Sequence, residues 1–383
     1  MKPVYMDYNA TTPTDPQVLE AMLPYLKDEF GNPSSSHVYG QRAHEALVAA
    51  REKTASLIGC EPDEIVFTSS GSESDNQAII GTAIAHGRKG HIVTSQTEHP
   101  AVLKTCRYLQ ERLGCRVTYL PVDKFGLIST EDLEKAITNE TALVTIMHAN
   151  NETGTIQPIE EIGKILEDRH IPFHTDAAQS CGKIDVNVEK LGVDLLTIAG
   201  HKLYAPKGIG ALYIRNGTQL DSLIHGGGQE RGRRAGTENV PYIVGLGKAC
   251  EIAKRDLPDF KPRIKDLREG LCQGILDKLG GDSVVLNGHP QERLPNTLNL
   301  SFKGLVGEEL LRSIPEIAAS TGSACHSGSM EPSPVLTAMG LPKETALGAV
   351  RFSLGRWTSK DEVDYAVDLV SKNVNRIRQK LKA

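Results

Sequence analysis

"ALVTIMHANNETGTIQPIEEIGKILEDRHIPFHTDAAQ", residues 142–179, shows the alternation that decides the fold. Two apolar, β-branched runs, 142–150 and 171–179, flank a segment of helical period. Neighbouring parallel strands need a long connection between them, which is usually a helix. The stretch is therefore typical of a strand–helix–strand unit in a parallel sheet.

The same alternation extends over residues 16–240. It predicts an α/β fold whose mainly parallel, seven-stranded sheet is sandwiched by helices. The strand-like runs are "EIVFTSS" (64–70), "HIVTSQ" (91–96), "RVTYLPV" (116–122), "ALVTIMHAN" (142–150), "IPFHTDAAQ" (171–179), "DLLTIAG" (194–200) and "GALYIRN" (210–216).

The first predicted helix starts after Asp15, which is a suitable N-cap residue. Its apolar side chains gather on one face. They are Val18, Leu19, Met22, Leu23 and Leu26.

From about residue 241 the pattern changes. The segment 242–257 is helical and leads through "PDFKP" (258–262) into another predicted helix over 263–279. Two strand-like segments, "NTLNLSF" and "ALGAVRFSLG", precede a closing amphipathic helix from about 360 to 381. We therefore expect a large domain over 16–257 and a smaller α+β domain formed by 1–15 and 258–383.

Composition excludes several classes of protein. The net charge of −5 over 383 residues argues against a general binder of nucleic acid. No apolar stretch is long enough to span a bilayer, and the N-terminus is polar from residue 7 onward. We expect a cytoplasmic protein without membrane contact.

The seven cysteines form no CxxC pair, and their number is odd. This disfavours a disulfide framework, and we predict no metal site. Six cysteines lie in or beside apolar or helical segments, as structural cysteines do. Cys325 differs, because it lies in the polar stretch "ASTGSACHSGSMEPS" (319–333). By itself it is a candidate nucleophile, metal ligand, disulfide partner or bystander.

Polar residues follow several predicted strands, where open α/β sheets bind ligands. Asp176 lies near the end of a strand, although a helix N-cap is its simplest role. Gly71 and Ser72 lie at a predicted helix start, where free backbone N–H groups suit a phosphate. The surrounding sequence matches neither GxGxxG nor a P-loop, which disfavours dinucleotides and nucleoside triphosphates.

Lys202 follows a strand in "AGHKLYAPKGIGALYI" (199–214). A partly desolvated lysine at such a place is a candidate for a Schiff base. Lys207 is a rival in the same segment, and the sequence does not separate the two. His99 and Asn151 follow two further strands.

A phosphate site, a carboxylate, an imidazole, an amide and a lysine at one sheet edge match the needs of one cofactor. Pyridoxal 5'-phosphate carries a phosphate, a basic ring nitrogen, a flat ring, a phenolic oxygen and an aldehyde. The combination predicts a pyridoxal phosphate enzyme.

Eleven ordered motifs make the interpretation more specific. They are "YMDYNATTP", "FGNPSSSH", "SGSESDN", "TEHPAV", "HANNETGTIQP", "HTDAAQSCGK", "GHKLYAPKGIGALYI", "HGGGQERGRRAGTENV", "STGSACHSG", "EPSPVL" and "RFSLGR". From about residue 4 to the C-terminus the chain resembles the cysteine desulfurases of the NifS and IscS type. These are fold-type I, class V pyridoxal phosphate enzymes, which implies an aminotransferase-like fold.

The resemblance implies a role for each group around the cofactor ring. Lys202 would form the Schiff base, and Asp176 would pair with the pyridine nitrogen. His99 would stack on the ring and take part in acid–base steps. Gln179 would donate a hydrogen bond to the phenolic oxygen.

The resemblance also implies a shared phosphate site. Gly71, Ser72 and His201 would hold the phosphate, joined by Thr237 of the partner subunit. This contact implies an obligate homodimer. The family usually has a serine where this chain has Ala199, so one phosphate ligand is missing.

For the substrate, the resemblance implies L-cysteine. Asn151 would bind the cofactor and, together with Arg351, the substrate carboxylate. Cys325 would attack the substrate sulfur, giving alanine and a persulfide for an acceptor such as an iron–sulfur scaffold protein.

Alternatives stay open at this point. His326 follows the nucleophile where threonine is common, and the similar selenocysteine lyases also have histidine there. A selenocysteine lyase would use the same cofactor residues. A class V transaminase would need Lys202 but not Cys325. A metal-binding or thiol-redox scaffold protein would use Cys325 and His326 as ligands.

Overall fold

The computed structural model describes residues 3–87, 90–322 and 331–382. Its largest element is a seven-stranded sheet in the order β2-β8-β7-β6-β5-β3-β4. The strands are β2 (Ile65–Thr68), β3 (His91–Ser95), β4 (Arg116–Leu120), β5 (Thr141–Thr145), β6 (Phe173–Asp176), β7 (Leu195–Ala199) and β8 (Gly210–Ile214). From β4 to β7 all neighbours are parallel, and β8 is antiparallel to both β7 and β2. Each predicted run overlaps one of these strands, so the predicted sheet is confirmed.

Helices cover both faces of this sheet, because successive side chains of a strand point to opposite sides. Val144 and Leu196 pack in a core with α2, α7, α8 and α9, whereas their neighbours Leu143 and Leu195 pack with α4 and α5 on the other face. The helices of this part are α1 (Pro16–Lys27), α2 (Val38–Ile58), α3 (Gly71–Asn76), α4 (Thr82–Ala85), α5 (Pro100–Tyr108), α6 (Thr130–Ala136), α7 (Ile159–Glu167), α8 (Val188–Leu191) and α9 (Val240–Leu279).

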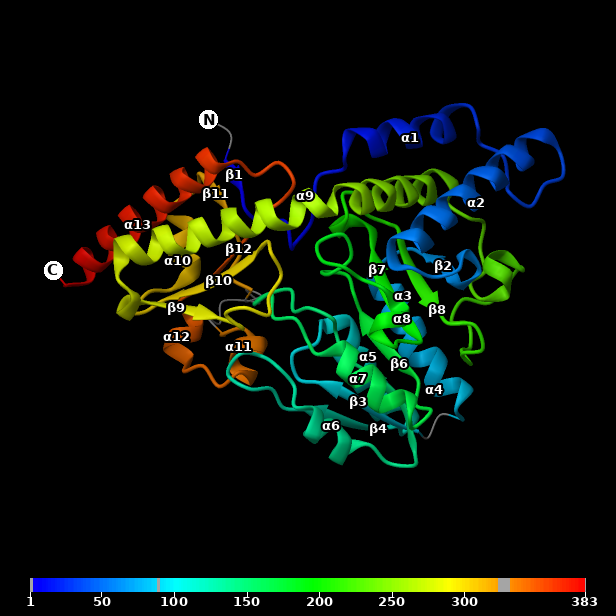
Figure 1. Cartoon of the computed structure of the whole chain (residues 1–383), viewed down its shortest axis with the longest axis horizontal. Coiled ribbons are helices and arrows are strands. Elements are labelled where there is room, and N and C mark those ends of the chain that lie inside the picture. The colour runs from blue at the N-terminus through cyan, green and yellow to red at the C-terminus, as the bar shows by residue number, and fades with distance from the viewer. Residues whose placement is uncertain (1–2, 88–89, 323–330, 383) are drawn as a thin grey trace.

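A three-stranded antiparallel sheet, β12-β10-β9, lies beyond the large one (Figure 1). The N-terminal strand β1 pairs in parallel with β11, which joins the start of the chain to its last third. The elements here are β1 (Val4–Tyr5), β9 (Val284–Asn287), β10 (Thr297–Phe302), β11 (Ile317–Ala318), β12 (Ala349–Ser353), α10 (Gly307–Arg312), α11 (Pro334–Ala338), α12 (Lys343–Leu347) and α13 (Lys360–Lys382). Most of them share a second apolar core, whereas α11 and α12 pack in a smaller cluster with Ala349 of β12. The closing helix predicted from about 360 to 381 is confirmed.

The prediction of two helices separated at "PDFKP" is wrong. The structure has one helix, α9, which contains both Pro258 and Pro262. A proline disfavours a helix interior, since it lacks an N–H donor. Here packing decides instead, because Ala253 lies in the core of the large sheet and Ile264 in the core of the small one. Figure 1 shows α9 running from α1 and α2 to α13.

Helix α1 begins as predicted, with the Asp15 side chain accepting a hydrogen bond from the Gln17 N–H (2.8 Å). Only part of its apolar face is covered. Val18 and Met22 are buried, but three leucines of the predicted face are at least one-third exposed. They are Leu19, Leu23 and Leu26.

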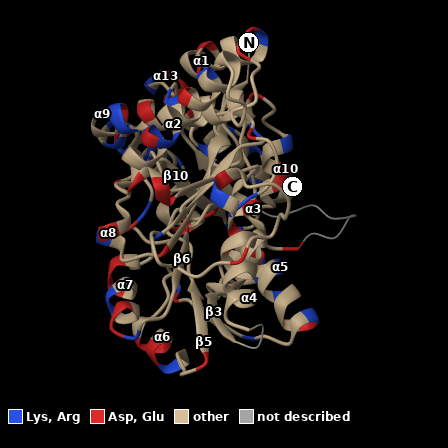
Figure 2. Cartoon of the chain, turned by 90° about the vertical axis from the view of Figure 1, so that its right-hand side faces the viewer, with Lys and Arg blue, Asp and Glu red and all other residues tan. Residues whose placement is uncertain are grey.

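The outer helices carry both kinds of charge, as the near-balanced composition leads one to expect. In Figure 2, basic and acidic residues both occur on α6, α7 and α13. None of the helices within the described residues is both long and apolar enough to cross a membrane.

Candidate active site

A cavity of about 250 Å³ lies beyond the carboxyl ends of the parallel strands. Parallel strands bring their ends to one edge, so residues that are distant in sequence meet there. The cavity is lined by nine of the residues predicted from the sequence: Gly71, Ser72, His99, Asn151, Asp176, Gln179, His201, Lys202 and Arg351.

Two predicted residues are not among those that line the cavity. Thr237 lies on an exposed loop beside Thr68 and Ser69, in a separate hollow of the same chain. Cys325 lies outside the described residues, and so does His326.

Lys202 is the lysine of the cavity, whereas Lys207 is exposed and does not line it. Lys202 ends the short 3-10 turn Gly200–Lys202 that follows β7. Its Nζ donates hydrogen bonds to the backbone oxygens of Asn9 (2.5 Å) and Ala10 (2.7 Å). Burial, together with the charge of Arg351, lowers the pKa of the Lys202 amine to about 8. The structure thus places in the cavity the lysine that the resemblance singles out and that the residue pattern alone does not separate from Lys207.

Two carboxyl groups are buried at the same place. Asp176 Oδ1 accepts one hydrogen bond, from the Ala178 N–H (2.9 Å), and burial raises the pKa of the Asp176 carboxyl. Asp75 is also buried, its Oδ1 has no hydrogen-bond partner among the described residues, and burial raises its pKa too. Ligand atoms of Asp75, Asp176 and His99 lie within 4.8 Å of one another. Buried carboxylates are stable only beside a cation or donors, so the protonated ring nitrogen of pyridoxal phosphate fits this end of the cavity.

His99 is the N-cap of α5, and its Nδ1 accepts a hydrogen bond from the Ala101 N–H (3.1 Å). In the neutral ring the proton is therefore on Nε2. His99 is exposed and lines the cavity. Desolvation lowers the pKa of the imidazole, while the charge of Asp176 opposes that shift.

The other end of the cavity suits a phosphate. Helix α3 starts at Gly71, after the N-cap Ser70, so the first N–H groups of the helix are free for an anion. His201 lies on the same side and bonds Thr11 Oγ1 through Nδ1 (3.2 Å). A Cβ placed on Gly71 would approach the Ala199 Cβ to 3.1 Å, so the helix start and the end of β7 are in close contact.

Arg351 comes from β12 of the small sheet and reaches the cavity from the opposite side. Its Nη2 donates to Asp7 Oδ1 (2.7 Å) and its Nη1 to the backbone oxygen of Asn151 (3.0 Å). The buried Nε has no partner among the described residues. A guanidinium so placed has a donor left for an anionic ligand.

Sequence reasoning missed a buried network centred on Asn9. The Asn9 backbone oxygen accepts from Lys202 and from Gln179 Nε2 (3.0 Å), and its side-chain oxygen accepts from Lys183 Nζ (3.3 Å). Its Nδ2 donates to Thr297 Oγ1 (2.8 Å) of the small sheet. Asn9 and Lys183 both stand in motifs quoted above, but nothing in the sequence indicates that the two motifs meet.

The segment that contains Cys325 begins and ends near the cavity. On one side Ser320 pairs with Arg351 through both backbone groups. Gly322 lies against the Glu152 carboxyl group, and Ser333 beyond the segment donates to Glu152 Oε2. Glu152 is itself buried, and burial raises the pKa of its carboxyl group to about 7.

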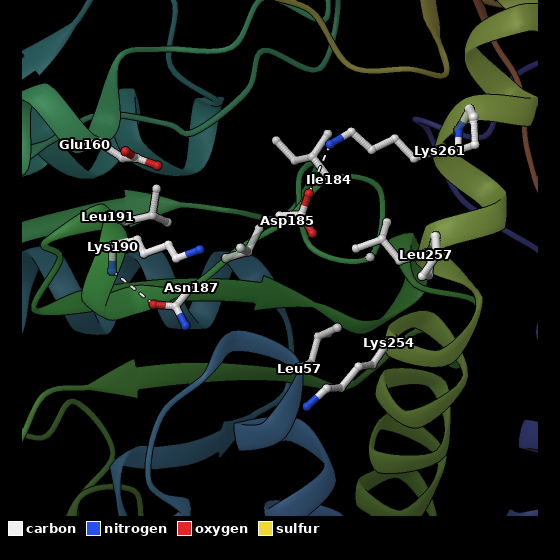
Figure 3. Close-up of a pocket in the computed structure, with 14 residues that line it drawn as sticks. Leu57, Glu160, Ile184, Asp185, Asn187, Lys190, Leu191, Lys254, Leu257 and Lys261 are labelled. Atoms are coloured by element: carbon white, nitrogen blue, oxygen red, sulfur yellow. Dashed lines mark hydrogen bonds and ion pairs between the residues drawn. The ribbon is translucent and has the colours of Figure 1, made fainter.

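A second hollow lies between α8 and the middle of α9 (Figure 3). Its polar side chains include exposed lysines with partners of their own. Lys261 pairs with Asp185 (3.0 Å), and Lys254 donates to Ser56 Oγ (2.7 Å). This hollow brings together none of the predicted site residues, so the candidate active site is the cavity that contains Lys202.

Known proteins support the same conclusion. Residues 4–366 match the family model of class-V aminotransferases. A cysteine desulfurase IscS of Dictyoglomus turgidum is 50% identical over 378 residues, which is 98% of this chain and 95% of that protein.

Solved structures agree as well. A NifS-like protein shares 40% identity at a TM-score of 0.91, over 97% of this chain and 99% of its own. A structure described as SspA in complex with cysteine shares 43% identity at a TM-score of 0.80, over 93% of this chain and 99% of its own. The chain therefore belongs to the class-V aminotransferase family of pyridoxal phosphate enzymes and, within it, to the cysteine desulfurases of the NifS and IscS type.

Proposed function

We propose that this protein removes sulfur from L-cysteine, giving L-alanine and a persulfide on Cys325. The observation that carries the proposal is a lysine with a pKa of about 8 that shares one cavity with a buried Asp176 and with Arg351. Pyridoxal phosphate bound there supplies an electron sink for the substrate carbon atoms.

Four residues are proposed to hold the ring of the cofactor. Lys202 binds it covalently, since a large fraction of its amine is neutral near pH 8 and can react with an aldehyde. Asp176 keeps the ring nitrogen protonated, and His99 covers the ring and carries protons. Gln179 donates a hydrogen bond to the phenolic oxygen. Gly71, Ser72 and His201 hold the phosphate.

Arg351 and Asn151 are proposed to bind the substrate carboxylate. The guanidinium is buried and rigidly held by Asp7, yet its Nε is without a partner among the described residues. A carboxylate is the ligand that such a donor prefers. The substrate amine then lies on the side of Lys202.

Cys325 is proposed as nucleophile and sulfur carrier. Its thiolate forms an S–S bond with the substrate sulfur while the substrate Cβ–S bond breaks, and the carbon fragment leaves as alanine after taking up protons. No oxidant is needed, because one thiol and cysteine become one persulfide and alanine. Gly322 lies beside Glu152, which is the neighbour of Asn151 in the sequence. Cys325 follows Gly322 by three residues, and three residues span at most about 11 Å. This chain length supports a role for Cys325 close to the proposed substrate site.

A homodimer is proposed, with Thr237 reaching the phosphate of the partner subunit. The leucines of α1 left uncovered support it, together with Phe30 (75% exposed) and Val38 (52% exposed). Apolar surface of this kind is typical of a protein interface. We also propose residues 16–257 as the cofactor-binding domain and 1–15 with 258–383 as the smaller one.

A sulfur-acceptor protein, such as an iron–sulfur scaffold, is the proposed recipient, and the cytoplasm is the proposed compartment. Each cysteine within the described residues is a free thiol, as expected where thiols stay reduced.

Replacing Cys325 tests the proposal. Cys325→Ala should keep the visible absorbance of the bound cofactor but lose both turnover and the persulfide, measured as alanine and as protein-bound sulfur. Cys60→Ala is the matched control, because burial raises the pKa of the Cys60 thiol to about 12 and makes it a poor nucleophile. Full turnover by Cys325→Ala would contradict the proposed mechanism. Comparison of cysteine with selenocysteine as substrate separates the selenocysteine lyase alternative, which rejection of cysteine would favour.

A further inference from the structure

We propose that Lys183 is a positioning residue for the cofactor: it fixes the orientation of the Gln179 amide so that an N–H donor faces the phenolic oxygen. The inference rests on the role proposed above for Gln179.

Lys183 is a buried lysine with amide oxygens around it instead of carboxylates. It is 5% exposed, and its Nζ donates to Gln179 Oε1 (2.6 Å) and to Asn9 Oδ1 (3.3 Å). Among the residues that the structure describes, these are its only acceptors. Burial, together with the charges of Lys202 and Arg351, holds the pKa of the amine well below its usual range. An amine in such surroundings costs folding free energy, which argues for a role in the site rather than in stability.

The contacts of Gln179 define which end of its amide is oxygen. Its Oε1 accepts a hydrogen bond from Lys183 Nζ (2.6 Å), and its Nε2 faces the Asn9 backbone oxygen (3.0 Å), which can only accept. Turning the amide over would place two donors together at one end and two acceptors at the other. Lys183 thus supplies half of the constraint on this side chain.

The orientation matters because Gln179 lines the cavity. Its Nε2 has two N–H groups, and among the described residues only Asn9 takes one of them. The second is available to a ligand. A donor at the phenolic oxygen stabilises negative charge there, which lowers the proton affinity of the nearby nitrogen that Lys202 contributes.

A double-mutant cycle on the loaded enzyme tests the inference. The readout is the pH midpoint at which the visible absorbance band changes, which reports the protonation of that nitrogen. Lys183→Met and Gln179→Leu should each raise the midpoint, by on the order of one pH unit. The double variant should match Gln179→Leu alone, because Lys183 acts through Gln179. Additive shifts would mean that Lys183 acts by its own charge on Lys202 and would overturn the inference.

The same experiment separates this inference from the proposed function. A wild-type protein without a visible band contradicts the proposed function. If Gln179→Leu shifts the midpoint and Lys183→Met does not, only the inference fails. Lys183→Gln keeps an N–H donor without the charge, so its midpoint should lie near that of the wild type even if the methionine variant does not fold. If the midpoint of Lys183→Gln rises as much as that of Gln179→Leu, the result contradicts the explanation by a hydrogen bond.

Discussion

The two sheets of this protein face one cavity but supply it with different groups. The seven-stranded sheet brings Lys202 and Asp176 from the ends of its strands, both buried or half-buried and both with shifted pKa values. The three-stranded sheet brings Arg351, which is held by Asp7 and has one donor unused among the described residues. The large sheet thus suits a cofactor that stays, and the small one suits a ligand that leaves. Substitutions on the two sides should therefore fail in different ways.

The largest effect should follow from Lys202→Ala. Loss of the amine should abolish the visible band and lower turnover by on the order of 10^4-fold or more, measured as alanine released from cysteine. Lys207→Ala is the control in the same segment and should change turnover by a few-fold at most, because Lys207 lies outside the cavity. The opposite ranking of the two variants would contradict the assignment.

The pH dependence of cofactor reconstitution also tests the contribution of the large sheet, through the pKa of Lys202. Only the neutral amine reacts with an aldehyde, and the pKa of Lys202 is lowered from 10.5 to about 8. At pH 7 this increases the neutral fraction by about 300-fold. The rate at which the cofactor-free protein gains the visible band should rise with pH and level off above about 8. A free alkyl amine, measured in parallel, corrects for ionisation of the cofactor, and a tenfold rise per unit beyond pH 9 would contradict the lowered pKa.

On the side of the small sheet, Arg351→Gln should leave cofactor binding unchanged and weaken substrate binding. The loss of a charge-assisted hydrogen bond should raise KM for cysteine by about 10- to 100-fold, while the visible band is kept. Arg356→Gln is the matched control, because Arg356 pairs with Asp15 outside the cavity and should affect stability instead. Loss of the visible band in Arg351→Gln would contradict the assignment of the cofactor to the large sheet and of the substrate to the small one.

The smallest effect concerns the phosphate end. Ala199→Ser adds a hydroxyl group beside the start of α3, and one more hydrogen bond should tighten cofactor binding about fivefold. Ala199→Val adds bulk without a donor and should weaken binding, since the Ala199 Cβ already lies 3.1 Å from where a Cβ on Gly71 would be. Equal affinities of the serine and alanine proteins would show that this position does not reach the phosphate.

Much of the fold could be predicted because it depends on local patterns. The seven strand-like runs and the Asp15 cap are written in consecutive residues, and all are present in the structure. Helix α9 could not be predicted in the same way. Its two prolines argue locally for a break, and only packing against two separate cores keeps the helix continuous.

The candidate site likewise has residues that could be predicted from the sequence and residues that could not. Nine residues that the sequence singled out line the cavity, because strand ends and motifs mark them. Asp75, Asn9 and Lys183 were missed, since each becomes unusual only by burial beside particular partners.

The sequence by itself determined the order of strands and helices, the family and the set of reactive residue types, because these follow from periodicity and motif. The tertiary structure decided which lysine lines the cavity and which way Gln179 faces. Both depend on desolvation and on hydrogen bonds between segments far apart in the chain, such as residues 9 and 202. Such contacts exist only once the chain has folded, and the same is true of the burial and the Arg351 charge that lower the pKa of Lys202.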